Sequence, residues 1–169
     1  MQTAATTTKT GQLPDALSGP LLKTGQDVRL AARANSCTVT SGLAPGYVQT
    51  NLIVLPSQYA TDFRLLCQRN PVPCPLVGES TKPGSFSTFN SYIPGVDGKD
   101  MLRNVDIRRD APRYNVYDNG NVKKDRCTDI VEDWTDDHVA FLIGCSFSFE
   151  TALTAAGLPP RHTVLGRNV

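Results

Sequence analysis

The sequence has few of the residues on which common metal and redox sites depend. Among its 169 residues there are two histidines, and its five cysteines occur at irregular spacing with no Cys-x-x-Cys pair. A histidine-rich metal site is therefore excluded by number, and the missing Cys-x-x-Cys pair argues against a zinc ribbon or a dithiol redox site. An odd number of irregularly spaced cysteines is typical of reduced thiols in an intracellular protein. We predict neither a metal nor another cofactor.

Long apolar runs and blocks of charge are also missing. The longest apolar segment, residues 139–143, is far shorter than the roughly 18 residues of a membrane span. The net charge is +1 with no basic block, so neither nucleic acid nor a membrane surface is expected as a partner. Residues 1–10 are rich in threonine and alanine and lack the apolar core of a secretory signal. We predict a flexible tail over residues 1–24 and a cytoplasmic protein. A mitochondrial location is the alternative, because the tail is poor in acidic residues.

Length and composition predict one folded domain over residues 25–169. A chain of this length buries about two thirds of its extended surface on folding. Helix-forming residues predict a helix over residues 25–34. Ser57 stands at an N-cap position before apolar residues at helical spacing, which predicts a second helix that ends before Pro71. Residues 78–99 are rich in Gly, Ser, Thr and Pro and predict a long loop.

One strand and one hairpin are indicated in the middle of the chain. Residues 48–55 become fully apolar toward their end, which predicts a central strand that is covered on both faces. Gln49 and Asn51 share one face of that strand, as either a structural hydrogen-bond network or a pair of ligand-binding amides. The Asn119-Gly120 pair within residues 114–123 predicts a β-hairpin with a type I′ turn.

Candidate chemistry is concentrated between Asp136 and Gly157. The apolar residues 139–143 predict a buried segment, and a helix over residues 148–156 is expected to end at Gly157. Four polar or nucleophilic side chains lie between them: Cys145, Ser146, Ser148 and Glu150. A helix that starts after a glycine exposes N–H groups that bind anions, although a serine there also acts as a simple cap. Cys145 is interpreted more readily as a packed thiol than as a nucleophile, because no spacing places a base beside it.

A second group of charged residues lies within residues 105–114, which hold three arginines and two aspartates. If this segment is a strand, Asp106, Arg108 and Asp110 share one face. Such a run forms either a solvated ladder of ion pairs or a site that binds carboxylates through the planar forks of Arg108 and Arg113.

Asn70 precedes a segment with three prolines in residues 71–75. So many fixed φ angles predict extended backbone. Asn70 and this segment are therefore either a rigid rim of a site or a simple connector.

Four segments of the chain together resemble the signature blocks of the D-glutamate cyclase family, whose bacterial members are usually called hydro-lyases. In chain order these blocks are residues 44–52, 67–76, 106–114 and 141–150. Their order across residues 29–169 makes the match specific. The resemblance implies an α/β fold with a mixed β-sheet flanked by helices in a layered sandwich, to which the hairpin is added. It also implies that the chain spans the N-terminal two thirds of the family and is truncated at its C-terminus.

The resemblance further implies conversion of D-glutamate to 5-oxo-D-proline with loss of water. Such an enzyme must hold two carboxylates and transfer protons from the amine to the departing oxygen. Arg108 and Arg113 are the candidates for carboxylate binding, and Asp106 and Asp110 are expected to orient them. The full set of candidates is Ser146, Ser148, Glu150, Asp106 and Cys145 for catalysis, and Arg108, Arg113, Asp110, Gln49, Asn51 and Asn70 for substrate binding.

The expected partner is thus a small amino acid or carboxylic acid, without a metal or cofactor. Self-association is a further expectation, because an incomplete family member would expose apolar surface. The alternative function is a non-catalytic protein that binds a small carboxylic acid, or an inactive truncated member of the family.

Overall fold

The structure, a computed structural model, describes residues 22–166, so nearly all of the tail expected over residues 1–24 lies outside the described residues. The first half of the fold contains α1 (Gly25–Arg33), β1 (Thr50–Pro56), the 3-10 turn η1 (Ser57–Tyr59), α2 (Ala60–Arg69), β2 (Leu76–Ser80) and β3 (Phe89–Ser91). The second half contains α3 (Gly98–Met101), β4 (Tyr114–Asp118), β5 (Asn121–Cys127), β6 (His138–Gly144), α4 (Phe147–Ala155) and α5 (Arg161–Val164). No helix in this range is long and apolar enough to cross a membrane.

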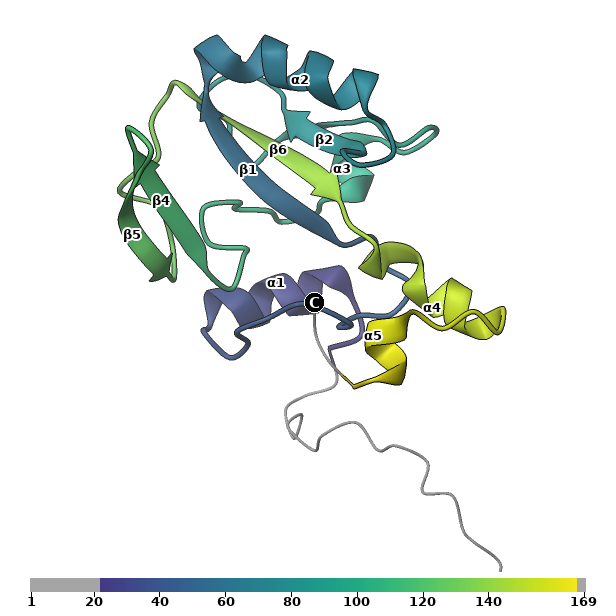
Figure 1. Ribbon diagram of the computed structural model, residues 1–169. Coiled ribbons are helices and arrows are strands. Elements are labelled where there is room, and N and C mark those ends of the chain that lie inside the picture. The colour runs from purple at the N-terminus through teal and green to yellow at the C-terminus, as the bar shows by residue number, and fades with distance from the viewer. Residues whose placement is uncertain (1–21, 167–169) are drawn as a thin grey trace, which may run out of the picture.

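The four-stranded sheet has the order β1-β6-β2-β3, and the hairpin β4–β5 stands beside β1 as a separate unit. Helix α2 covers one face of the sheet, whereas α1 lies on the opposite side (Figure 1). The α/β class, the layered arrangement and the hairpin are confirmed. The sheet was expected to be mixed, but each recorded pairing of its strands is antiparallel. No two neighbouring strands of the described sheet are parallel, because β1 and β2 both run antiparallel to β6, which lies between them. Helix α2 provides the crossover that joins β1 to β2.

Strand β6 is the centre of the fold. Its side chains alternate between two apolar clusters, as the two-residue period of a strand requires. Val139, Phe141 and Ile143 pack with residues of α2, and Ala140 and Leu142 pack on the opposite face with residues of β3 and of the segment before β4. Phe141 is fully buried. The prediction of a buried segment over residues 139–143 is confirmed.

Strand β1 is an edge strand, which corrects the prediction of a central one. Its apolar residues Leu52 to Leu55 are only half-buried. Composition reports how much burial a segment needs, but the pairing order of a sheet depends on which distant strand pairs with it. Here β6 pairs with one edge of β1, and the other edge faces the hairpin.

Three further segments differ from expectation. The predicted loop over residues 78–99 contains β3 and the start of α3. Gly98 allows this, because a Cβ there would lie 1.8 Å from the Phe89 carbonyl oxygen. The proline-rich segment after Asn70 turns instead of running extended, and the Cys74 N–H donates to the Asn70 carbonyl at 3.0 Å. Proline has a φ angle that also suits turns. Residues 106–110 form a turn rather than a strand.

Two local turn signals are confirmed, but the predicted N-cap at Ser57 is wrong: Ser57 lies within η1, and its hydroxyl donates to the Asp137 carboxylate instead of accepting a hydrogen bond from a helix N–H. Asn119 and Gly120 have φ angles of 49° and 79°, as a type I′ turn requires. Gly157 has a φ of 80° just after α4, where a left-handed residue ends a helix. Thr24 and Asp27 form a reciprocal capping box at the start of α1.

Candidate active site

The connection from β6 to α4 is held against the residue that precedes β1. The Gln49 N–H donates to Ser148 Oγ at 2.9 Å, and the Ser148 hydroxyl donates to the Gln49 carbonyl at 3.1 Å. The Cys145 N–H and thiol donate to the same carbonyl at 3.2 and 3.5 Å. Ser148 and Cys145 therefore join the start of α4 to the start of β1, and this accounts for both side chains without chemistry.

Ser146 and Glu150 belong to a different cluster. The Ser146 hydroxyl donates to Glu150 Oε1 at 2.7 Å, and His162 Nε2 lies 2.9 Å from Glu150 Oε2. Glu150 is buried, with 9% of its surface exposed, whereas Ser146 is exposed. The rings of His162 and Phe147 pack edge to face, with 6.0 Å between the ring centroids. The result is a chain of imidazole, buried carboxylate and solvent-facing hydroxyl.

The backbone explains how this cluster forms. Ser146 and Glu150 are four residues apart at the start of α4, so they lie on one face of the helix. After Gly157 the chain reverses, with the Leu158 N–H donating to the Leu153 carbonyl at 2.9 Å. Pro160 then starts α5, which carries His162 back to α4.

His162 was not among the predicted site residues. It is one of only two histidines in the chain, and the turn signal of Gly157 with Pro159 and Pro160 lies between it and α4. That combination indicates a turn after α4, and the structure shows that the turn brings His162 onto Glu150. The other histidine, His138, lies at the opposite end of β6.

The cluster can transfer protons. A carboxylate between a hydroxyl and an imidazole accepts hydrogen bonds from both and can pass a proton between them. It does not have the composition of a metal site. Within residues 22–166, no three His, Cys, Asp or Glu side chains lie close enough to bind a metal ion together.

Asp110 forms the second buried carboxylate cluster, and it corrects one predicted role. It was expected to orient Arg108 or Arg113, but it binds Arg33 Nε through Oδ1 and lies 3.4 Å from Arg29 Nε through Oδ2. It also accepts the Asp106 N–H at 2.9 Å. The hydrogen bond that Arg33 donates to Asp110 raises the pKa of Arg33, whereas burial lowers the pKa of Arg29. Asp110 thus fastens α1 to the segment before β4.

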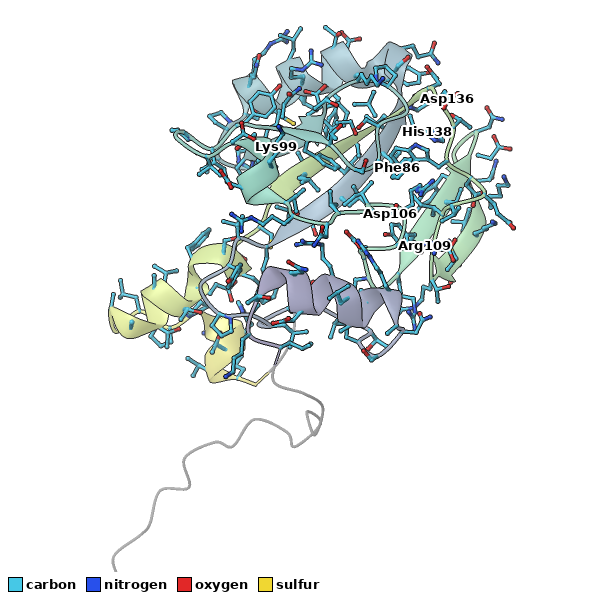
Figure 2. All side chains as sticks on the ribbon, turned by 180° about the vertical axis from the view of Figure 1, so that it is seen from behind. Phe86, Lys99, Asp106, Arg109, Asp136 and His138 are labelled. Carbon is cyan, nitrogen blue, oxygen red and sulfur yellow. The ribbon has the colours of Figure 1, made fainter. Side chains whose placement is uncertain are left out.

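Arg108 is already bound to a carboxylate of its own chain. Its Nε and Nη2 donate to the two oxygens of Asp106 at 2.8 and 2.9 Å, and its guanidinium lies 3.4 Å above the Phe86 ring. Figure 2 labels Asp106 and Phe86 on neighbouring segments near the sheet. Burial opposes ionisation of Asp106, but the hydrogen bonds and charge of Arg108 outweigh it and lower the pKa of Asp106. As predicted, Asp106 orients Arg108, and a role of Arg108 in substrate binding stays a prediction.

The remaining candidates are spread over the fold. Arg113 and Asn51 line a groove of about 780 Å³ between β1 and β4, and Arg113 donates to Asn35 Oδ1 at 3.3 Å. The Gln49 side chain donates to the Leu43 carbonyl at 3.1 Å, and Asn70 donates to the Leu66 carbonyl at 2.8 Å at the end of α2. Each of these two side-chain amides thus donates a hydrogen bond to a backbone carbonyl close to it in the sequence.

Comparison with known proteins bears on the same region. The family model described as D-glutamate cyclase matches residues 139–169, which include the whole Ser146–Glu150–His162 cluster. A protein of Aliivibrio salmonicida named "Putative hydro-lyase VSAL_I1435" is 46% identical over 144 residues, which are 85% of this chain and 51% of that protein. Proteins named "Putative hydro-lyase" from Rhodopseudomonas palustris and Azorhizobium caulinodans are 50% and 48% identical and are covered over 45% and 52% of their lengths.

These matches confirm the resemblance to the D-glutamate cyclase family over the part that the chain spans. The chain spans about half of the length of these relatives, a smaller share than the two thirds inferred from the sequence.

Proposed function

We propose that the chain carries proton-transfer residues of a hydro-lyase that converts D-glutamate to 5-oxo-D-proline with loss of water. The observation on which this rests is the buried carboxylate of Glu150 between the Ser146 hydroxyl and the His162 imidazole. Further support comes from the match of residues 139–169 to the D-glutamate cyclase model and from relatives named as hydro-lyases.

The reaction sets the number of protons that must move. The substrate ammonium gives up one proton, and the resulting amine attacks its own γ-carboxyl carbon, so that a C–N bond forms and one C–O bond breaks. Two protons leave the nitrogen, and both end on the departing oxygen as water, so the enzyme finishes with the protons it had at the start. Because the reaction is intramolecular, orientation supplies much of the rate and the remaining need is a two-way proton carrier.

The cluster fits that need. Glu150 and His162 accept the protons of the ammonium, since a carboxylate hydrogen-bonded to an imidazole can hold a proton at either group. Of the three hydrogen-bonded groups, the exposed Ser146 hydroxyl is the one that a substrate can reach. It passes protons to the departing oxygen. Because the Glu150 carboxylate is buried, the hydrogen bonds that it accepts are stronger than they would be in water.

The test is formation of 5-oxo-D-proline from D-glutamate, followed by chiral chromatography and mass spectrometry on the purified chain. L-glutamate serves as the competing substrate. We expect Glu150→Gln and His162→Gln to lower the rate by about 10²–10⁴-fold, the usual contribution of a general acid or base. The matched control is Glu132→Gln, because the Glu132 side chain is 90% exposed.

Two outcomes would contradict the proposal. If D-glutamate raises the melting temperature but no product forms, the chain is a carboxylic-acid-binding protein, which is the alternative function. If product forms at equal rates in the wild type and in both variants, the cluster is not the site of proton transfer.

A further inference from the structure

The outer edge of β1 offers unpaired backbone groups. The Cys145 N–H donates to the Gln49 carbonyl at one end of the β1–β6 ladder, and the Ser57 N–H donates to the Asp137 carbonyl at the other. Residues of an antiparallel strand alternate between facing their partner and facing away. Odd-numbered residues therefore face β6, and Thr50, Leu52 and Val54 direct their N–H and C=O groups outward. In the described part of the chain β1 pairs with β6 alone.

A groove of about 780 Å³ lies along this edge. Its opposite wall is β4, which pairs only with β5 among the described strands. Most of the residues that line it are apolar, and the charged residues Arg113 and Asp133 in it have opposite signs. Figure 1 shows β1 and β4 as neighbouring elements.

The composition of β1 indicates that the groove has an occupant. Leu52, Ile53, Val54 and Leu55 form the apolar run of a strand that is covered on both sides, yet all four are only half-buried. A long apolar edge is a template for pairing with another strand, and proteins that leave such an edge open usually protect it with charges. The run from Leu52 to Leu55 contains no charged residue.

We propose that this groove binds an extended, mainly apolar β-strand, and that the strand comes from the half of the hydro-lyase relatives that this chain does not span. The relatives are about twice as long as the matched part, so each contains a further region of similar size. The strand adds to β1 through the outward groups of Thr50, Leu52 and Val54, in the mode of β-strand addition. Pro56 has no N–H and ends the ladder.

The probe is the unmatched half of the Aliivibrio salmonicida relative, produced as a separate polypeptide and purified together with this chain. Backbone hydrogen exchange is then measured residue by residue for the chain alone and for the complex. In the complex, exchange at Thr50, Leu52 and Val54 should slow by about tenfold or more, because those amides become hydrogen-bonded. Exchange at Asn51, Ile53 and Leu55, already bonded to β6, should change little.

Variants separate pairing from packing. Leu52→Pro removes one outward N–H and leaves the bonds to β6 in place, so it should weaken the complex by about tenfold or more. Leu52→Ala keeps the N–H and removes the side chain, and should weaken it less. Thr50→Pro repeats the test at a residue outside the two apolar clusters, in case Leu52→Pro lowers stability.

Several results would overturn the proposal: no complex, a complex without protection of the three outward amides, or equal affinity for Leu52→Pro and the wild type. Slow exchange at these three amides in the chain alone would also overturn it. If that protection rises with concentration, a second copy fills the groove, and if it does not, the chain fills its own groove. The assay measures no catalysis, so its result is independent of the proposed reaction.

Discussion

Asp110 and Glu150 are buried to nearly the same extent, with 6% and 9% of their surfaces exposed, but they have different neighbours. Asp110 lies against two guanidinium groups, and one of its oxygens also accepts a backbone N–H. Glu150 lies between a hydroxyl and an imidazole. Arginine stays protonated at any ordinary pH, whereas imidazole gains and loses a proton near neutrality. Burial alone therefore does not distinguish a structural carboxylate from one suited to proton transfer, and the partners do.

Glu79 supports this distinction. It is 5% exposed, and its two oxygens accept hydrogen bonds from Nε and Nη2 of Arg64. It also accepts a hydrogen bond from the Tyr92 hydroxyl at 2.9 Å. The hydrogen bond to Glu79 raises the pKa of Arg64. Glu79 thus follows the pattern of Asp110 and fastens α2 to the sheet.

The largest effect on stability is expected from Asp110→Asn. The change leaves Arg29 and Arg33 without their counter-charge in a partly buried site, and breaking such a pair costs about 3–5 kcal/mol. Urea unfolding should show a lower midpoint with an unchanged slope. Asp100→Asn is the control, because Asp100 pairs with Arg103 at the surface, where a pair contributes about 1 kcal/mol or less. A loss of the same size in both variants would mean that Asp110 does not fasten α1.

A smaller effect on stability is expected from Glu150→Gln. The amide keeps an acceptor for the Ser146 hydroxyl and leaves no permanent cation unpaired, so the loss should be about 1–2 kcal/mol. The same urea titration measures it. If Glu150→Gln destabilises the chain as much as Asp110→Asn, the contrast between the two carboxylates fails and Glu150 belongs with the structural group.

The smallest effect is expected in the pH dependence of stability that Asp106 contributes. Because the folded-state pKa of Asp106 is lowered below the ordinary value of 3.8, the ion pair with Arg108 stabilises the fold above that pH. This contribution is lost as the pH falls through the lowered pKa. It should be less than about 1 kcal/mol, since the pair is partly solvated. Asp106→Asn should be less stable than the wild type at pH 6, and the difference should shrink below the ordinary pKa. A difference that does not change with pH would show that the charge is irrelevant.

Turns, helix ends and the buried strand could be predicted from the sequence because each depends on residues within a few positions of it. A positive φ at Asn119 and Gly120 or at Gly157 depends on residues within one turn, and the structure has them there. The apolar run of β6 demanded burial whatever its partners were. Its connection to a polar helix start also singled out Ser146 and Glu150 as candidates before any contact was known.

Tertiary structure decided which of these groups meet. Sequence spacing did not predict that His162 contacts Glu150. It also did not predict that Asp110 pairs with arginines of α1 and not with Arg113, or that β1 is an edge strand. Each of these depends on contacts between segments 12 to 94 residues apart, such as the pairing of Thr50 with Gly144. Apolar pattern and turn chemistry act within a few residues, so the sequence by itself determined the elements and their candidate side chains. The pairing order of the strands and the partner of each buried charge came from the packing of distant segments, because only packing determines which groups lose their water together.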